Sequence, residues 1–507
     1  MTDFTEAIAG AYAVDGPAIA LGRGVHEGRL DPGAVVQAPL AMINRHGLIA
    51  GATGTGKTKT AQGLAEQLSA AGVPVLMADV KGDLSGLGAP GEPGGGAEKR
   101  AAELGEPFVP AACPVEYLSI GGIGPGVPVR ATVSDFGPQL LGKILGANET
   151  QEQSLQLVFH YADTKGLPLL DLADLRALLT YLDSDAGKPE LEGIGGLSGA
   201  TVGVLLRALV GVETGGGTEF FGEPQLDIAD LLRVDADGRG VISLVELPAV
   251  QDRPLLWSTA LMWLVAELFE TLPEAGDLPK PKLVVFLDEA HLLFHDATEA
   301  FVSSIEQTVR LIRSKGVGVF FITQTPKDVP GSVLAQLGNR VQHALRAFTP
   351  EDAKALKATV STFPKSSFYD LEELLPQLGI GEAIVTILDD NGVPTPVVHA
   401  RLPAPRSRMA PADDVEGTAK ASPLYAKYGT RVDAQSAREI LAARMEQAAP
   451  PAAAPAPPRP KAPRAPKPPP APESPTDRIT DFLGSRQGKA LQKQVMRGVF
   501  GMLKKRM

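Results

Sequence analysis

Residues 51 to 58 read GATGTGKT, a glycine-rich loop that ends in a lysine and a threonine. Such glycines let backbone N–H groups point inward at phosphate oxygens, and a following helix adds the positive end of its dipole. We expect Lys57 to reach the β- and γ-phosphates of ATP and the Thr58 hydroxyl to bind Mg²⁺. The residues predicted to contact the nucleotide are Gly51, Ala52, Thr53, Gly54, Thr55, Gly56, Lys57, Thr58 and Lys59.

The elements around this loop have the order that a phosphate site requires. The apolar residues 48–50 predict a strand before the loop, and a helical pattern follows from Thr60 to Ala70. Strand, loop and helix in this order form the arrangement in which such loops bind phosphate. The alternative is a glycine-rich turn that binds nothing, and it would need this arrangement to arise by chance.

A pair of carboxylates forms the second chemical signal. Asp288 and Glu289 directly follow the apolar run Leu283–Leu287. A buried strand that ends in acids delivers them to the edge where open α/β sheets bind ligands. We predict that Asp288 holds Mg²⁺ through a water molecule and that Glu289 is the base that polarises the attacking water. The alternative role, capping a helix that begins near Ala290, is compatible with this one.

A glutamine and two arginines extend the candidate site. Gln324 follows the apolar strand Val317–Thr323, where its amide would sense the γ-phosphate and transmit its presence to segments that move. The other interpretation is that Gln324 is a polar turn residue before Pro326. Arg310 and Arg313 share one face of the helix before that strand, because they are three residues apart. They are either a solvated helix face or arginines that reach the nucleotide of a neighbouring subunit.

The elements that must position these residues alternate along the chain. Short apolar runs and helical patterns follow each other ahead of residue 448, which predicts an α/β fold with a mostly parallel sheet covered by helices. A turn signal at residues 389–392 joins two further runs into a hairpin, which we expect to finish the core at one edge. The other predicted strands are Gly47–Ala50, Val75–Val80, Gly240–Leu247, Leu283–Leu287 and Val317–Thr323.

Composition divides the chain further. No strand pattern appears between residues 136 and 235, so we expect an inserted all-helical subdomain there. Half of residues 450–475 are proline, which indicates an extended linker, and the residues after it show the periodicity of a basic amphipathic helix. The expected units are 1–135, an N-terminal segment with the first half of the core; 136–235, the insertion; 236–447, the second half of the core; 448–476, the linker; and 477–507, the basic helix.

Length, cysteine content and hydropathy exclude several classes of protein. The chain has 507 residues, of which 44% are apolar and 21% charged, so a peptide-sized scaffold is excluded. Its single cysteine, Cys113, forms no intramolecular disulfide, and the N-terminus carries acids where a signal peptide carries lysine or arginine. The most apolar stretch, Leu255 to Phe269, is shorter than the roughly 20 residues that cross a bilayer. We expect a cytoplasmic protein without a transmembrane helix.

The charge is unevenly distributed. The net charge is −11, but residues 448–507 carry +9, which leaves −20 for the first 447 residues. An acidic body disfavours wrapping of its outer surface by nucleic acid, although an internal channel is not excluded. We expect the basic C-terminal helix to dock on this protein or a sister subunit, or else to bind a protein partner, nucleic acid or an anionic membrane.

Together these features resemble the HerA/FtsK branch of P-loop ATPases. More closely, the chain resembles the bacterial HerA-like proteins that carry a helicase HerA-like C-terminal domain, over about residues 15 to 445 and the basic C-terminal helix. The motifs that carry the resemblance are RHGLIAGATGTGKT at Arg45–Thr58, ADVKGDLSGL at Ala78–Leu87, FFGEP at Phe220–Pro224, the strand end Leu283–His291, and ITQTPKDVP at Ile322–Pro330.

The resemblance implies a RecA-like core, a homo-oligomer in the form of a hexameric ring, ATP hydrolysis at subunit interfaces, and translocation of double-stranded DNA through the pore. It also implies that Arg313, 24 residues after Glu289, is the arginine finger, with Arg340 and Arg346 as alternates. One feature departs from the family. HerA-type translocases carry a β-barrel before the P-loop, and the 50 residues that precede Gly51 are too few for it, so a role in DNA-end resection does not carry over.

Two motifs allow more than one interpretation. Asp79, Lys81 and Asp83 follow the second predicted strand at the same sheet edge; Asp79 would support the metal and Lys81 a pore loop, or Asp83 and the glycine before it only cap a turn. Phe220 and Phe221 either line a pore and stack on a base, or pack in the core.

Three functions follow from these features. The leading hypothesis is a ring-forming, Mg²⁺-dependent ATPase that translocates or remodels DNA. The second is an ATPase that acts on a protein substrate. The third is a nucleotide-gated scaffold without translocation, which recruits partners through its C-terminal tail; intact Lys57, Asp288 and Glu289 argue against it.

Overall fold

The chain divides into two compact units, Met1–Gln447 and Ala448–Met507. The computed structural model describes residues 3–191, 193–294 and 299–448. Apart from Ala448, the predicted Pro/Ala-rich linker and the predicted basic helix lie outside the described residues.

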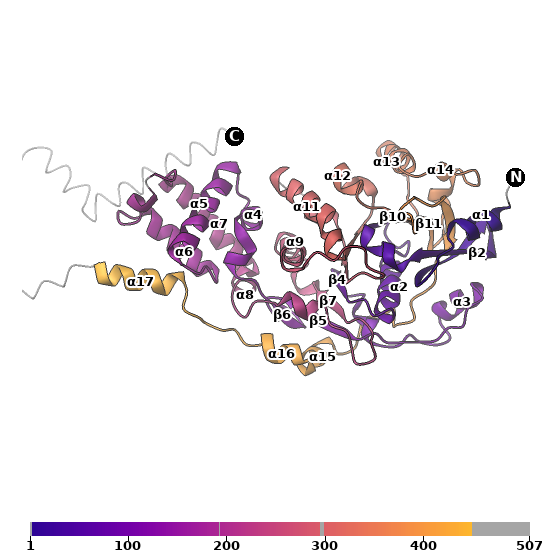
Figure 1. The fold of residues 1–507 in the computed structure, drawn as a ribbon, viewed down its shortest axis with the longest axis horizontal. Helices are drawn as coiled ribbons and strands as arrows, with labels where there is room; N and C mark the ends of the chain where they lie inside the picture. Colours follow the sequence, from indigo (N-terminus) through magenta and orange to yellow (C-terminus); the bar gives the residue numbers. More distant parts are fainter. Residues whose placement is uncertain (1–2, 192, 295–298, 449–507) are drawn as a thin grey trace, which may run out of the picture. The chain divides into compact units, whose positions relative to one another are not determined.

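The described residues of the first unit are built on one twelve-stranded sheet (Figure 1). Its order is β2-β1-β12-β11-β10-β3-β9-β8-β4-β7-β5-β6. Pairing is parallel from β10 to β6 and antiparallel from β2 to β10. The strands are β1 Ala18–His26, β2 Arg29–Pro39, β3 Gly47–Ala50, β4 Val75–Asp79, β5 Val115–Ile120, β6 Val127–Val129, β7 Ile242–Glu246, β8 Leu283–Leu287, β9 Val317–Thr323, β10 Asn339–Gln342, β11 Glu382–Thr386 and β12 Val398–Arg401.

Helices cover this sheet and form a separate group beside it. Strands β8 and β9 are uninterrupted apolar runs and every residue in them is buried, as expected for strands covered on both faces. The helices are α1 Phe4–Ala11, α2 Lys57–Ala70, α3 Gly96–Glu103, α4 Val133–Leu145, α5 Glu149–Lys165, α6 Leu172–Asp183, α7 Gly199–Val212, α8 Thr218–Phe220, α9 Pro254–Thr271, α10 His291–Phe294, α11 Glu299–Ile312, α12 Gly331–Leu334, α13 Pro350–Val360, α14 Leu371–Leu374, α15 Val415–Ala421, α16 Pro423–Tyr428 and α17 Ala437–Ala448.

The predicted α/β fold with a mostly parallel sheet is confirmed. The five apolar runs named above form β3, β4, β7, β8 and β9. The predicted hairpin is also present: β11 pairs with β12, and the Asp389 carboxylate accepts the N–H groups of Asn391 (2.9 Å) and Val393 (2.8 Å) in its turn.

The expectation that this hairpin finishes the sheet is wrong. Strand β12 pairs onward with β1, and β2 follows as the edge strand. Gly22 interrupts the apolar pattern of β1 and therefore reads as a breaker in the sequence. In the structure a Cβ at this position would lie 2.0 Å from the backbone oxygen of Arg401, so glycine is required by the close approach of β12.

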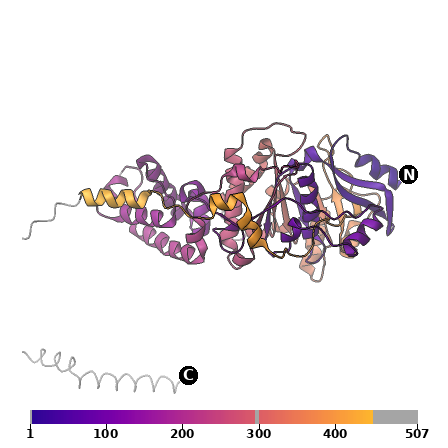
Figure 2. The same cartoon turned by 90° about the horizontal axis from the view of Figure 1, so that it is seen from below.

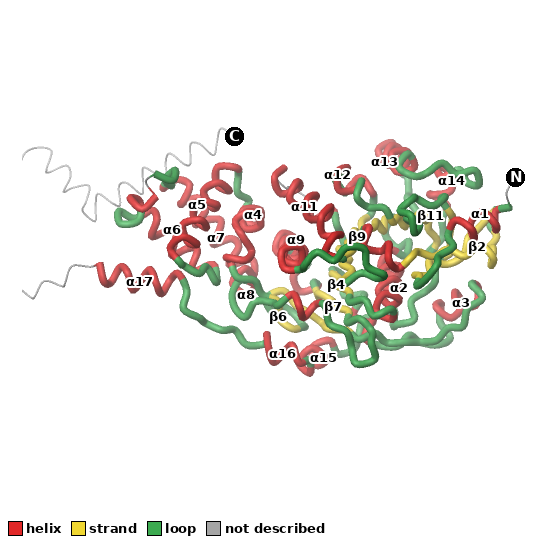
Figure 3. Tube along the Cα trace, viewed as in Figure 1, coloured by secondary structure: helices red, strands yellow, loops and turns green. Residues whose placement is uncertain are grey.

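Between β6 and β7 the described residues form helices and turns without a further strand of the sheet. The longer helices there are α4, α5, α6 and α7, and Figure 3 shows them as red helices grouped apart from the yellow strands. The same grouping is visible when the view is turned by 90° (Figure 2). The division of the chain into the domains listed above stays a prediction.

The two adjacent phenylalanines of the FFGEP motif pack in the core. Phe220 and Phe221 are completely buried. The ring of Phe136 lies 5.0 Å from that of Phe221, and Phe220 meets the ring of Trp263 at 6.1 Å, both edge to face. The packing interpretation is confirmed, and these side chains do not line a pore. Within the described part of the chain, no helix has the length and apolar character that crossing a membrane requires.

Candidate functional site

The glycine-rich loop between β3 and α2 has the conformation that a phosphate cradle needs. Gly51, Gly54 and Gly56 have φ values of 152°, 78° and 115°, a region that residues with a Cβ rarely adopt. The loop is also fastened to its neighbours: Gly51 N–H donates to the oxygen of Thr323 (3.2 Å) at the end of β9, and Thr55 O accepts from Gly381 N–H (3.1 Å). The cradle is therefore formed by the fold itself.

The two lysines of the motif point in different directions. Lys57 Nζ lies inside the loop, where it donates to the oxygens of Gly51 (2.7 Å) and Ala52 (3.2 Å). Burial lowers the pKa of Lys57, although Glu289 and Asp288 oppose the shift. Lys59 Nζ instead donates to the carbonyl oxygens of Asp83 (3.0 Å) and Met409 (2.8 Å). The side chain of Lys59 thus joins the start of α2 to Asp83 and Met409. Its predicted contact with the nucleotide stays a prediction.

The predicted acids stand at the same edge of the sheet as the loop. The strand order β3-β9-β8 separates the phosphate loop from Asp288 by a single strand. Asp288 is 8% exposed, and burial, followed by repulsion from Glu289, raises its pKa to about 7. Glu289 adopts a φ of 48°, and its N–H donates to Asp288 Oδ1 (2.9 Å).

The carboxylate of Glu289 is engaged on both oxygens. Lys81 Nζ lies 3.1 Å from Glu289 Oε1, and His291 Nδ1 lies 3.4 Å from Oε2. Sequence reasoning had not assigned Lys81 to the nucleotide site. The only signal for it was the parallel placement of β4 and β8, whose carboxyl ends meet at one edge.

The turn after β4 is built by Asp79. Its Oδ1 accepts the N–H groups of Gly82 (2.7 Å) and Asp83 (3.2 Å), and its Oδ2 accepts that of Leu84 (2.8 Å). These contacts agree with the turn interpretation, with the correction that Asp79, and not Asp83 and Gly82, provides the cap. The carboxylate of Asp79 thus accepts three backbone donors, and its support of the metal stays a prediction.

Gln324 stands exposed directly after β9, between the strands that carry the phosphate loop and Asp288. The backbone around it is held by Asp328, whose Oδ2 accepts from Thr323 Oγ1 (2.8 Å) and from Thr325 N–H (3.1 Å). The structure therefore brings Lys57, Thr58, Asp288, Glu289 and Gln324 to one edge of the sheet.

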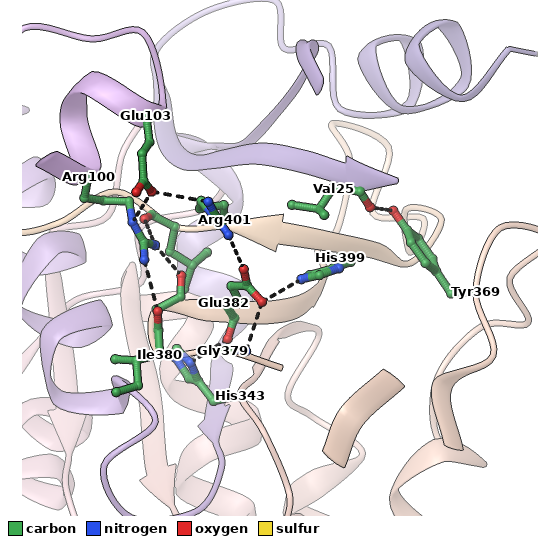
Figure 4. Close-up of polar contacts among 12 residues, drawn as sticks. Val25, Arg100, Glu103, His343, Tyr369, Gly379, Ile380, Glu382, His399 and Arg401 are labelled. Carbon is green, nitrogen blue, oxygen red and sulfur yellow. Dashed lines mark hydrogen bonds and ion pairs between the residues drawn. The ribbon is translucent and has the colours of Figure 1, made fainter. Parts of the chain in front are cut away.

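A polar network supports the far side of the phosphate loop (Figure 4). Glu382 bonds Arg401 (2.6 Å) and His399 Nε2 (3.2 Å), and these partners hold the pKa of its carboxyl well below the usual range. Arg100 donates to the oxygen of Gly381 (2.9 Å), the residue whose N–H bonds the phosphate loop. The sequence analysis missed this network, because its members come from three distant segments.

His343 connects the network to the helix that follows the loop. Its Nδ1 donates to the oxygen of Glu382 (3.0 Å), which leaves Nε2 to accept from Thr60 Oγ1 (3.0 Å). Burial lowers the pKa of His343 to about 4, so the ring is neutral.

The predicted finger lies at the opposite edge of the sheet. Arg313 begins the 3₁₀ turn Arg313–Lys315 directly before β9, Arg45 ends the segment before β3, and Arg340 lies at the start of β10. With Arg310 they line a pocket of about 590 Å³ that contains no Asp or Glu. Sequence reasoning missed Arg45, whose only signal was its place two residues before the strand of the phosphate loop.

The arginines of this pocket differ in how they are used. Within the described residues, no ion pair or hydrogen bond joins the guanidinium groups of Arg45, Arg310 and Arg313 to another residue, although the charge of Asp277 acts on Arg45. Arg340, by contrast, donates to the oxygens of Leu337 (3.1 Å) and Thr362 (3.1 Å). We call Arg45, Arg310, Arg313 and Arg340 with their lining the arginine pocket.

The second alternate, Arg346, does not belong to the arginine pocket. It follows β10 at the carboxyl edge of the sheet and donates to the oxygen of Pro376. Of the three arginines considered as fingers, Arg313 alone combines the amino edge with a guanidinium group unpaired among the described residues.

Within one chain the arginine pocket and the phosphate loop cannot meet. Strand β9 has seven residues, and it separates Arg313 from the loop that bonds its other end. Seven residues of extended chain span about 23 Å, which is longer than an arginine side chain.

The comparisons with known proteins agree with this fold. The family described as helicase HerA-like C-terminal matches residues 26–506. A curated relative, the probable helicase MJECL08 of Methanocaldococcus jannaschii, is 30% identical over 125 residues, which cover 24% of this chain and 22% of that protein. The match therefore spans about a fifth of the relative's length.

Two solved structures align with most of this chain. The bacterial conjugative coupling protein TrwBdeltaN70, in its unbound monoclinic form, aligns with a TM-score of 0.51 at 15% identity, over 80% of this chain and 95% of that chain. VirB4 of Thermoanaerobacter pseudethanolicus aligns with a TM-score of 0.48 at 16% identity, over 77% of this chain and 97% of that chain. The likeness to TrwBdeltaN70 confirms the expected RecA-like P-loop fold.

Proposed function

The chain belongs to the family described as helicase HerA-like C-terminal, and from this premise we propose that it is a Mg²⁺-dependent ATPase that works as a ring of identical subunits. The observation that carries the proposal is the convergence at one sheet edge of a preformed phosphate loop with Lys57 and the acids Asp288 and Glu289. A fold that ends β3 and β8, with one strand between them, in these groups has the parts that phosphoryl transfer to water requires.

Each group has a role that its position supports. The backbone N–H groups of the loop and Lys57 bind the phosphates. Thr58 and Asp288 would hold Mg²⁺, which would neutralise charge on the β- and γ-phosphates. Among the described residues no cluster of three or more His, Cys, Asp or Glu side chains could hold a metal ion. Two protein ligands agree with Mg²⁺, because this ion ordinarily completes its shell with water and phosphate oxygens. Glu289 accepts the proton of the attacking water, and Gln324 reports the γ-phosphate.

The ring proposal rests on the arginine pocket. Arg313 cannot reach the phosphate loop of its own chain, and its guanidinium group is unpaired among the described residues. We propose that the amino edge of one subunit meets the nucleotide of the next, so that Arg313 stabilises the charge of the transition state. Such a head-to-tail contact repeats from subunit to subunit, and it forms a ring when its rotation closes. The family resemblance implies that this ring is a hexamer. We propose the cytoplasm as its location, as the single cysteine and the acidic N-terminus suggest.

We propose double-stranded DNA as the track of this motor. The family description and the similarity to the probable helicase MJECL08 support this proposal. Because residues 1–447 carry a net negative charge, we expect the DNA phosphates to contact a channel or the basic tail. A protein substrate is the alternative. The C-terminal tail, outside the described residues, would bind a partner in either case.

The test is steady-state ATP hydrolysis by the full chain with and without double-stranded DNA, with Glu289→Gln as the blank. We expect Mg²⁺-dependent turnover above the blank, stimulated by DNA. ATP turnover that DNA does not change would favour a protein substrate. ATP turnover equal to that of the blank would refute the proposed ATPase activity. DNA binding across salt concentrations, with and without residues 448–507, then assigns the phosphate contacts to the ring or to the tail.

A further inference from the structure

Lys81 is the one lysine outside the phosphate loop that contacts a proposed reacting group in the described chain. Its Nζ lies 3.1 Å from Glu289 Oε1. The side chain of Lys81 is 54% exposed, whereas that of Glu289 is 14% exposed. The lysine therefore approaches the buried carboxylate from the solvent side, where it is free to change its partner.

The backbone that carries Lys81 is fixed, in contrast to its side chain. Asp79 accepts three N–H groups of the turn, from Gly82, Asp83 and Leu84. Lys59, on the helix that begins at Lys57, bonds the oxygen of Asp83 (3.0 Å). The turn is thus tied to the phosphate loop, and Lys81 is presented at a constant place beside the nucleotide site.

Charges of both signs surround Lys81. Burial alone would lower the pKa of Lys81, but the hydrogen bond and charge of Glu289, together with Asp288, raise it, so the amine is a cation. Lys57 and Lys81 both follow strands that end at the carboxyl edge of the sheet, and the charge of Lys81 is a minor contribution to the lowered pKa of Lys57. A phosphate bound at Lys57 would consequently attract Lys81 as well.

The present contact restrains Glu289. Both carboxylate oxygens have a partner, Lys81 on one and His291 on the other. An oxygen that accepts a hydrogen bond from an ammonium group is less available to a water molecule. A base in this state has to be released before it can take a proton.

We propose that Lys81 senses the triphosphate: it holds Glu289 in the present state, and it turns to the γ-phosphate when ATP binds, which releases Glu289 to polarise water. This inference rests on the proposed ATPase function. In the reaction a water oxygen forms the bond to the γ-phosphorus as the bond to the bridging oxygen of ADP breaks, and Glu289 receives the proton of the water. Lys81 exchanges one anion for another and takes part in no bond change.

The experiment compares the dissociation constants of ADP and of a non-hydrolysable ATP analogue, each with Mg²⁺, for the full-length protein and three variants. For Lys81→Met we expect the analogue to bind about tenfold more weakly while ADP changes by less than about twofold, because ADP has no γ-phosphate. Lys81→Arg should keep the ratio of the two dissociation constants within about threefold of that of the unchanged protein. Lys99→Met, a matched change of an exposed lysine on α3, should alter neither constant.

Other outcomes distinguish failure of the sensing role of Lys81 from failure of the proposed ATPase function. Failure of the unchanged protein to bind either nucleotide would refute the ATPase itself. Equal weakening of ADP and analogue by Lys81→Met, or a lower kcat with both constants unchanged, would overturn the sensing role alone, since a residue that merely orients Glu289 does not distinguish the two nucleotides. A structure with the analogue in which Lys81 still contacts Glu289 would also overturn it.

Discussion

The two edges of the same sheet treat their charged residues differently. At the carboxyl edge, Lys57 is bound to loop carbonyl oxygens and Lys81 to Glu289. At the amino edge, Arg45 and Arg313 line a pocket without Asp or Glu, and their guanidinium groups have no hydrogen-bond or ion-pair partner among the described residues. A cation in this position can accept an anion that another molecule supplies. The comparison indicates that the charged groups of the carboxyl edge have partners within one chain, whereas Arg45 and Arg313 at the amino edge have none among the described residues.

The largest expected effect tests whether the carboxyl edge is a nucleotide site at all. Lys57→Ala removes the cation inside the phosphate loop, so binding of ATP and its turnover should both be lost, with kcat/KM lowered by roughly 1000-fold or more. The measurement is hydrolysis together with binding of a fluorescent nucleotide. Unchanged hydrolysis would refute the assignment of the loop, and Lys99→Ala serves as the control.

The second effect belongs to the amino edge. Arg313→Ala should lower kcat by about 1000-fold and leave ATP binding intact, because the finger acts on the transition state of a neighbouring site. Arg346→Ala is the matched control: it lies at the other edge, engaged on Pro376, and should leave kcat within about threefold. An equal loss of kcat in Arg313→Ala and Arg346→Ala would contradict the claim that the arginine finger lies at the amino edge.

The third prediction concerns pH, with one buried histidine at each edge. Burial lowers the pKa of both His46 and His343 to about 4, and Val319 N–H donates to His46 Nδ1, which protonation would prevent. The unfolded chain takes up these protons near pH 6.5, so stability falls as the pH drops from 6.5 toward 4. At pH 5 each histidine should cost about 2 kcal/mol of unfolding free energy.

Denaturant unfolding at pH 7 and pH 5 measures this cost. His46→Gln and His343→Gln should each remove its share of the pH-dependent difference, whatever their effect at pH 7. If neither variant flattens the dependence, the two rings are not held neutral by the fold.

The smallest expected effect lies in the network beside the phosphate loop. Glu382→Gln removes a carboxylate that bonds Arg401 and His399, and it should raise the KM for ATP about threefold while kcat is kept. The effect is indirect, because Glu382 supports the segment whose Gly381 N–H bonds the loop. A large fall in kcat instead would place Glu382 in the chemistry.

The sequence predicted the carboxyl edge well because its chemistry is local. The phosphate loop and the acids after β8 are contiguous motifs, and the ends of parallel strands share an edge. Lys81 was expected in a pore loop, and its contact with Glu289 was missed because that contact depends on a side-chain direction across two strands. Lys59 stays a predicted nucleotide contact; its spacing fits the motif, but its ammonium group turns to Met409, 350 residues away in the sequence.

The amino edge and the antiparallel part of the sheet were harder to predict for a physical reason. Arg45 carries no local pattern, and only the order of β10, β3 and β9 brings it to Arg313. Strand β1 contains Gly22, which in a sequence indicates a turn and in the fold permits close pairing with β12. Non-local pairing of this kind leaves no periodic signal.

The most direct test of the central claim is to mix two inactive variants. Arg313→Ala keeps Glu289, and Glu289→Gln keeps Arg313, so a mixed assembly contains interfaces in which one subunit supplies the intact nucleotide site and the next supplies the arginine. We expect ATP hydrolysis that neither variant shows alone, highest near an equal mixture. No recovery at any ratio, with co-assembly of the two variants demonstrated, would contradict the claim that the amino edge of one subunit completes the carboxyl edge of another.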